Sequence, residues 1–202
     1  YFIYWDYASW RDFLLTRPIP DPGVVLGVPA NGRYLGNLAG VLLAKLYVWP
    51  VLRGLAMGAA LLALVRLLSE QGRGLTRRER LALAFSLVVL APRGLWQQVY
   101  SWGAGMGNYL LPMVCVLLLM NWLEGKKRTA PLFALIAFAA ALCMETVTLW
   151  LVLAAAVLFV LRLRRGQGRG EAAALLLGAL AGAICMAAAP GYGQVGSGGD
   201  QR

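Results

Sequence analysis

The chain has 202 residues, of which 60% are hydrophobic and 14% are charged. Soluble domains are only about 45–50% apolar, so this composition excludes an ordinary soluble domain and is typical of a polytopic membrane protein. The net charge of +10 does not indicate a nucleic-acid partner, because the basic residues cluster in short connectors between apolar runs. The lack of histidine excludes His-based metal sites and Ser–His or Cys–His catalysis within this sequence.

The first 33 residues are predicted to form an external loop. Six of the first ten residues are aromatic, which suits a membrane interface, and residues 1–33 carry three Arg against three Asp. Asp6 lies in this aromatic stretch and is either a catalytic acid or base or an ordinary loop residue. The sequence starts at Tyr1 without an initiator Met or a signal peptide, so we expect an internal fragment of a longer protein.

Residues 34–49 are predicted to form an amphipathic helix on the outer leaflet that ends at Pro50. The dipeptide Asn31-Gly32 gives a turn signal directly before this helix. The alternative is a true membrane span, which would place residues 1–33 in the cytoplasm. That segment lacks the positive bias of a cytoplasmic loop, so the interfacial helix is the interpretation that the charges favour.

Apolar runs predict about six transmembrane helices between residues 51 and 189. A helix needs about 20 residues to cross roughly 30 Å of hydrocarbon. Several runs are shorter, so we expect them to recruit interfacial residues or to end at a protein-lined cavity. The prediction is an all-α, polytopic transmembrane helical bundle that forms one domain over residues 1–202. The runs are 51–68, 81–92, 109–123, 130–144, 146–161 and 172–189.

The basic residues determine the predicted orientation. The connectors 70–80, 124–128 and 162–169 together hold 11 of the 19 Lys and Arg residues, whereas the loops 93–108 and 190–202 hold one Arg each. By the positive-inside rule, the three basic connectors are cytoplasmic. The other two loops are therefore predicted to be external.

Four pairs of glycines have GxxxG spacing, which lets membrane helices approach each other closely. Because the chain contains 24 glycines, such spacings also arise by chance. The pairs are Gly36/Gly40, Gly54/Gly58, Gly103/Gly107 and Gly178/Gly182.

Glu145 is a carboxylate within a nearly uncharged stretch, residues 130–161. Both flanking connectors are predicted to be cytoplasmic, so the hairpin tip near Glu145 is expected on the outer side. A carboxylate there is costly unless it is paired, hydrated or protonated. Its possible partners are Arg33, Arg53 and Arg93. Glu145 is therefore either a catalytic or substrate-orienting group or one half of a structural ion pair.

The stretch SWGAGMGNYLLP, residues 101–112, is predicted to begin on the same outer side. Its glycines allow a tight turn or a close approach to a ligand. Trp102, Asn108 and Tyr109 either form a polar surface on which a sugar ring can stack or belong to an aromatic belt beside a flexible turn.

Two further external segments can contact phosphate. Arg33, in NGRYLGN, can hold a lipid diphosphate headgroup through two hydrogen bonds, or it anchors the chain to lipid headgroups. The segment PGYGQVGSGGDQR, which ends at Arg202, is rich in glycine but lacks the GxxxxGK[ST] pattern of a P-loop.

The order of these elements resembles a known family. An aromatic external loop, NGRYLGN, WGAGMGNYLLP, METVTLW and an APGYG loop follow one another on one side, as in polytopic bacterial proteins of the GT-C glycosyltransferase kind. The chain is most similar to the DUF6056-like proteins, which are related to O-antigen glucosyltransferases. The resemblance implies a polyprenyl-phosphate-linked sugar donor, a glycan acceptor and chemistry on the outer face of the bacterial inner membrane.

The resemblance also implies roles for individual residues. Such proteins usually carry an acidic pair in the first external loop, which is expected upstream of Tyr1 here and leaves Asp6 as a substitute. An external carboxylate would deprotonate an acceptor hydroxyl, and Arg or a divalent metal would stabilise the departing lipid phosphate. The resemblance implies a catalytic role for Glu145, which matches an acidic residue at the membrane edge, and the implied substrate-binding residues are Arg33, Trp102, Asn108, Tyr109 and Arg202.

Two other functions fit an intramembrane charge. A transporter or flippase of a lipid-linked or polar solute needs polar groups near the bilayer midplane, often in paired halves. Here the polar features gather at one face and no internal repeat is evident, which favours the enzyme. A non-catalytic membrane subunit would be supported by an upstream loop that lacks acidic residues.

Overall fold

The computed structural model describes residues 32–46, 49–72, 74–125 and 129–189. The regular elements in these ranges are all helices, so the predicted all-α class is confirmed. Four helices are long and apolar enough to cross a membrane, which indicates a multi-pass membrane protein. They are α4 (Pro50–Glu70), the continuous helix Gly103–Glu124, α10 (Glu145–Arg165) and α11 (Arg169–Ala187).

Three helices are shorter: α3 (Tyr34–Lys45), α5 (Arg77–Val89) and α9 (Ala130–Ala141), with 12, 13 and 12 residues. At 1.5 Å per residue they extend about 18–20 Å, less than the roughly 30 Å of hydrocarbon. The position of α3 on the outer leaflet stays a prediction, because length does not distinguish it from α9, which has the same 12 residues and runs between the two ends of the bundle.

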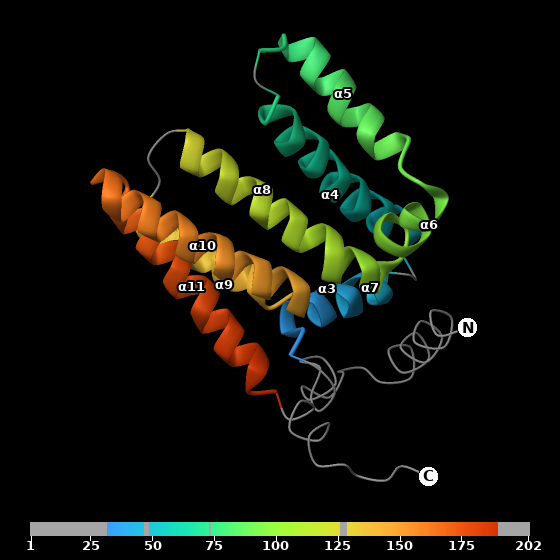
Figure 1. Ribbon diagram of the computed structural model, residues 1–202. Coiled ribbons are helices and arrows are strands. Elements are labelled where there is room, and N and C mark those ends of the chain that lie inside the picture. Colours follow the sequence, from blue (N-terminus) through green and yellow to red (C-terminus); the bar gives the residue numbers. More distant parts are fainter. Residues whose placement is uncertain (1–31, 47–48, 73, 126–128, 190–202) are drawn as a thin grey trace.

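Figure 1 shows how the charged connectors are distributed over the bundle. The connections between α4 and α5, between α8 (Leu111–Glu124) and α9, and between α10 and α11 all join helix ends that point to the upper left. The start of α3 and the turn between α9 and α10 lie at the opposite ends of the helices. The segregation of charge that the sequence predicts therefore coincides with the two ends of the described bundle.

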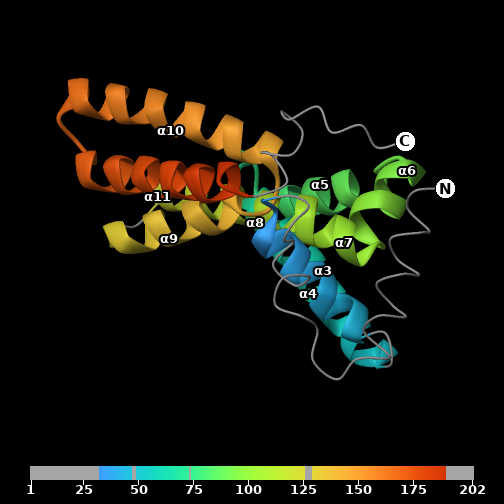
Figure 2. The ribbon, with the colours of Figure 1, turned by 90° about the horizontal axis from the view of Figure 1, so that it is seen from below.

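Two groups of helices share α8, as Figures 1 and 2 show. On one side α9 packs against α8, and α10 and α11 pack against α9 and each other, around Phe133, Leu119 and a set of buried alanines. On the other side α4 packs against α8 around Leu64 and Leu117, and α5 packs against α4. The alanine-rich faces of α9 and α11 explain why this pair is the most closely packed, since small side chains let the backbones approach.

Two of the predicted glycine pairs meet each other where α3 crosses the Gly103–Glu124 helix. A Cβ atom at Gly107 would overlap the carbonyl oxygen of Gly36, and one at Gly40 would lie 3.2 Å from the Cα of Ala104. A Cβ atom at Gly103 would lie 3.2 Å from the Cβ of Leu43. This crossing therefore depends on the missing side chains of both pairs.

The Gly178/Gly182 pair packs against α9 in a similar way. A Cβ atom at Gly178 would overlap the carbonyl oxygen of Ala134, and one at Gly182 would lie 2.6 Å from the Cβ of Ala141. A Cβ atom at Gly54 or Gly58 would meet nothing within 4 Å. Three of the four spacings are thus used for close helix contact among the described residues.

The interpretation of residues 101–108 as a flexible turn is wrong for residues 103–108, which are helical. After α6 (Arg93–Leu95) and a π-helical segment η2 (Trp96–Tyr100), the chain resumes as α7 (Gly103–Gly105) and the π-helical η3 (Met106–Leu110), which run directly into α8. Isolated glycines disfavour a helix by about 1 kcal/mol each. Here their contact with α3 outweighs that intrinsic preference.

Candidate functional site

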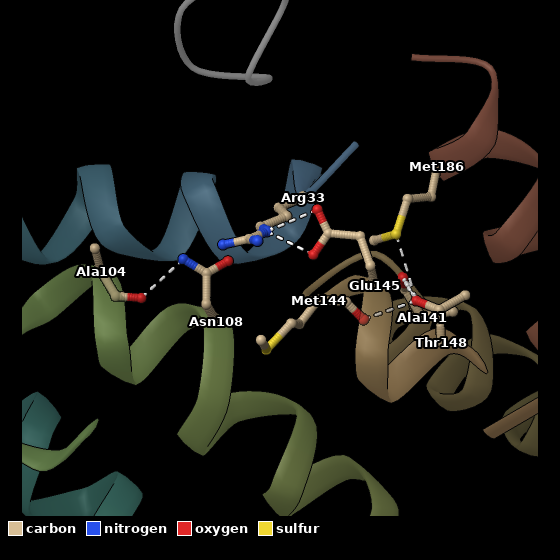
Figure 3. Close-up of polar contacts among 8 residues, drawn as sticks. All are labelled: Arg33, Ala104, Asn108, Ala141, Met144, Glu145, Thr148 and Met186. Carbon is tan, nitrogen blue, oxygen red and sulfur yellow. Dashed lines mark hydrogen bonds and ion pairs between the residues drawn. The ribbon is translucent and has the colours of Figure 1, made fainter. Parts of the chain in front are cut away.

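An ion pair joins the two charged residues that the sequence singled out. The Nε of Arg33 donates to both carboxylate oxygens of Glu145, at 3.0 Å to Oε1 and 2.8 Å to Oε2 (Figure 3). The two side chains are 30% and 34% exposed. Of the three partners proposed for Glu145, Arg33 is therefore the one that binds it. The pair is accessible from outside the protein.

The position of Glu145 follows from the turn between α9 and α10. Glu145 is the first residue of α10, where the helix macrodipole favours a negative charge. One turn later, the hydroxyl of Thr148 donates to the carbonyl oxygen of Ala141 at 2.6 Å, and the carbonyl oxygen of Met144 lies 2.9 Å away. Thr148 is buried, so these bonds fix the corner that carries the carboxylate.

The position of Arg33 follows from the start of α3. The main-chain N–H of Leu35 donates to the carbonyl oxygen of Leu142 at 3.0 Å, which ties the first turn of α3 to the end of α9. The glycine crossing described above holds the next turns of α3 against α7 and η3. Arg33 and Glu145, 112 positions apart in the sequence, are thus brought together by main-chain contacts on both sides.

Asn108 contributes a buried polar atom near this pair, and Trp102, directly before α7, carries another. The Asn108 Nδ2 donates to the carbonyl oxygen of Ala104 at 2.9 Å, while its Oδ1 is buried with no hydrogen-bond partner among the described residues. The Nε1 of Trp102 is in the same situation. Figure 3 shows the Asn108 amide beside the guanidinium of Arg33. Such unsatisfied groups are uncommon, and the Asn108 Oδ1 packs against Gly36, where a Cβ atom would overlap it.

The segment η3, which carries Asn108, has π-helical geometry. Asn108 and Tyr109 both belong to η3, and π-helical turns inserted in an α-helix often occur at functional sites. Tyr109 is half-buried, and Asn108 is only 7% exposed. The structure therefore places Arg33, Asn108 and Glu145 together, while Tyr109 follows Asn108 in η3 and Trp102 precedes the first residue of α7.

A groove of about 360 Å³ adjoins Glu145 between α10 and α11. Apart from Glu145 and Thr148, its lining is apolar, with Leu149, Val152 and Met186 among the residues that form it. The arrangement joins a charged pair to an apolar channel, which suits a ligand that has both a polar head and a hydrocarbon chain.

Other predicted site features are not tested by this geometry. Asp6 and Arg202 lie outside the described residues, as does most of the predicted external loop 1–33. In the part of the chain that the structure describes, no group of three or more Asp, Glu or Cys side chains is placed to hold a metal ion.

Two polar residues at the basic end escaped the sequence analysis. The Asn121 Nδ2 donates to the carbonyl oxygen of Leu67 at 3.2 Å, and Gln71 Nε2 donates to the Asn121 Oδ1, so α8 is bonded to the end of α4. The signal that could have revealed this contact is a polar Asn near the end of an apolar run. Thr148 was also missed, although it lies one helical turn from Glu145 and so on the same face.

Comparison of the chain with protein-family models, with curated proteins and with solved structures finds no match, so no family assignment follows from these comparisons.

Proposed function

We propose that this chain is the membrane-embedded part of a glycosyltransferase-like enzyme that takes a sugar from a polyprenyl-phosphate donor on the outer face of the bacterial inner membrane. The observation that carries the proposal is the accessible Arg33–Glu145 pair beside an apolar groove. The pair lies at the end opposite the arginine-rich connectors, which is the external end by the positive-inside rule.

The energetics of the pair support a ligand-binding role. A partly exposed ion pair contributes only about 0–1 kcal/mol to stability. A lipid phosphate that binds Arg33 in place of the carboxylate therefore costs the protein little. Arg33 binds phosphate oxygens well because its planar guanidinium matches their geometry. Release of Glu145 from Arg33 also makes its carboxylate a better base.

The proposed reaction uses the two residues in sequence. Arg33 binds the donor phosphate, and the prenyl chain lies in the groove along α10 and α11. The freed carboxylate of Glu145 takes the proton of an acceptor hydroxyl, whose oxygen attacks the anomeric carbon of the sugar. The bond between that carbon and the phosphate oxygen breaks, and Arg33 stabilises the charge of the departing lipid phosphate. Asn108, whose amide lies beside the guanidinium of Arg33, is suited to orient the sugar.

The distribution of polar groups favours an enzyme over a transporter. Among the described residues, the buried polar side chains are Ser69, Asn108 and Thr148. Each lies within two turns of the end of a membrane-crossing helix. A transporter is expected to place such groups near the bilayer midplane.

A sugar-transfer assay on the intact protein tests the proposal. The donor is polyprenyl phosphate that carries radiolabelled glucose, and the variants are Glu145→Gln and Arg33→Gln. Loss of a positioned base lowers turnover by roughly 100-fold or more, and we expect at least this for Glu145→Gln. Arg93→Gln is the matched control, because Arg93 is exposed at the start of α6. Wild-type turnover by Glu145→Gln would exclude a catalytic role for this carboxylate.

The double variant Arg33→Gln/Glu145→Gln separates catalysis from stability. If the pair has a purely structural role, removal of both charges relieves the unpaired charge that each single variant leaves, and activity recovers. The proposed mechanism expects the double variant to stay as inactive as Glu145→Gln. The thermal midpoint of each variant, measured without donor, shows whether the loss of activity reflects unfolding.

A further inference from the structure

A cavity of about 550 Å³ lies at the end of the bundle that carries the basic connectors. It is bordered by the last turns of α8 and α10 and the first turns of α9 and α11. This volume lies within the range of roughly 300–1,000 Å³ that is typical of small-molecule sites. Its lining includes Trp122, Phe133, Arg162, Arg169 and Glu171. The aromatic, cationic and acidic groups come from four different helices.

The turn between α10 and α11 directs two guanidinium groups to this cavity. Gly166 and Gly168 adopt positive φ angles of 74° and 62°, which favour glycine and let the chain reverse within a few residues. A Cβ atom at Gly168 would lie 2.9 Å from Nη1 of Arg162, so the turn also leaves room for that side chain. Arg162, in the last turn of α10, and Arg169, the first residue of α11, therefore line the same space.

Each arginine keeps donors beyond its contact with the main chain. Arg162 Nη2 donates to the carbonyl oxygen of Leu123 at 3.4 Å, and Arg169 Nη2 donates to that of Leu163 at 3.3 Å. A guanidinium has five N–H donors, so one such bond orients the group without exhausting it. Two oriented guanidinium groups at one cavity are suited to a phosphate, which accepts paired hydrogen bonds from arginine.

An acidic residue in the lining narrows the range of ligands that this cavity can bind. Glu171, in the first turn of α11, lines the same cavity and would repel a ligand that is anionic throughout. A primary ammonium group would be favourable there, because it can donate to the carboxylate. Trp122, which packs edge-on against Phe133 with ring centroids 5.8 Å apart, offers an indole that also attracts a cation.

We propose that this cavity binds the headgroup of a phospholipid that carries a phosphodiester and a primary ammonium, as phosphatidylethanolamine does. Arg162 and Arg169 hold the phosphate, and Glu171 holds the ammonium. The cavity lies at the ends of spanning helices, where lipid headgroups lie, and basic pockets between such helices on the cytoplasmic side bind lipid headgroups. The proposal is independent of sugar transfer, since Arg33 and Glu145 lie at the other end of the bundle.

The test uses the intact protein in detergent. Native mass spectrometry measures binding of phosphatidylethanolamine, phosphatidylglycerol and phosphatidylcholine with identical acyl chains. We expect wild-type protein to bind one phosphatidylethanolamine roughly tenfold more tightly than either of the others, as one charge-assisted hydrogen bond would give. Equal binding of phosphatidylglycerol would overturn the assignment of the ammonium to Glu171. If soluble phosphoethanolamine at equal concentration displaced phosphatidylethanolamine, the site would not require a lipid, and the proposal would be overturned.

Matched variants distinguish specific binding in this cavity from general attraction of lipids to the basic surface. Arg162→Gln and Arg169→Gln are each expected to weaken phosphatidylethanolamine binding roughly tenfold. Arg164→Gln and Arg165→Gln remove the same charge from exposed positions in the last turn of α10 and should leave binding unchanged. An equal loss in these controls would reduce the effect to non-specific attraction and overturn the proposal.

Glu171→Gln gives a readout that does not depend on overall stability. It should abolish the preference for phosphatidylethanolamine over phosphatidylglycerol while both lipids still bind. Because this preference is a ratio measured on one protein, it decides the proposal even if Arg162→Gln fails to fold without its bond to Leu123. A preference that persists in Glu171→Gln would contradict the proposed orientation of the headgroup.

Discussion

The glycine pairs of α4 and α11 have the same spacing and opposite surroundings. A side chain at Gly178 would collide with the backbone of α9, whereas a side chain at Gly58 would meet nothing within 4 Å. We call α3 and α7–α11 the packed group, and α4 and α5 the peripheral pair. The comparison teaches that GxxxG spacing permits close helix contact without requiring it, because a facing helix must also present small residues.

The largest expected effect comes from a leucine placed in each pair. Gly178→Leu should destabilise the protein by more than the roughly 1–3 kcal/mol that moderate overpacking costs, because the overlap is with a main-chain oxygen of Ala134 and not with a movable side chain. The measurement is the thermal midpoint in detergent, with the yield of monodisperse protein as a second readout.

Gly58→Leu is the matched control for that substitution. It should be neutral or slightly stabilising, since leucine favours a helix over glycine by up to about 1 kcal/mol. Equal disruption by Gly58→Leu would break the comparison, because it would mean that a partner covers this face of α4.

The next largest expected effect is a difference in stability between variants of two phenylalanines. Phe133 in α9 is 1% exposed, whereas Phe85 in α5 is 59% exposed. Phe133→Ala should cost about 3–5 kcal/mol, because it leaves a cavity among α8–α11, whereas Phe85→Ala leaves none. The difference between the two free energies of unfolding is the measured quantity. A cost for Phe85→Ala as large as that for Phe133→Ala would show that the peripheral pair is packed as tightly as the rest.

The smallest effect is local to the first turn of α5. Thr76 and Glu79 form a capping box, in which the N–H of Thr76 donates to Glu79 Oε2 at 2.8 Å. Thr129 begins α9 without a side-chain cap bond. Thr76→Ala should therefore cost about 1 kcal/mol, measured as faster amide exchange at residues 77–80, and Thr129→Ala clearly less. Similar changes in both variants would remove this distinction between the two helix starts.

The same cap has a predictable pH dependence. Hydrogen bonds from the N–H and the hydroxyl of Thr76 hold the pKa of the exposed Glu79 carboxyl below its ordinary value of 4.5. Because the pKa is lowered on folding, the contribution of Glu79 is complete above pH 4.5 and is lost as the pH falls through the folded-state value. Amide exchange at the start of α5 should accelerate over that range in wild type, and Thr76→Ala should weaken this response.

Local signals predicted much of the fold. Apolar runs and basic connectors are read directly from neighbouring residues, so the all-α class, the long apolar helices and the separation of charge between two ends followed from the sequence. The helical path of residues 103–110 did not, because glycine-rich sequence disfavours a helix in isolation. The contact with Gly36 and Gly40 that reverses this preference lies more than 60 positions away.

The sequence predicted which residues belong to the candidate site, but it did not predict which of them form a pair. Glu145 was conspicuous as a lone carboxylate in an apolar stretch, and Arg33 was one of three cations that could face it. The choice among them depends on how α3 crosses the other helices, which no local pattern encodes. The bonds of Asn121 to Leu67 and Gln71 were missed for the same reason.

A main-chain bond holds α3 to the end of α9 at the corner that carries the charged pair. The carbonyl oxygen of Leu142 receives the N–H of Leu35, so the join between α9 and α3 is made by atoms that every residue except proline supplies. Diverse residue types are therefore compatible with the join at both positions. The geometry of the charged pair can persist through sequence drift that would leave no recognisable motif there.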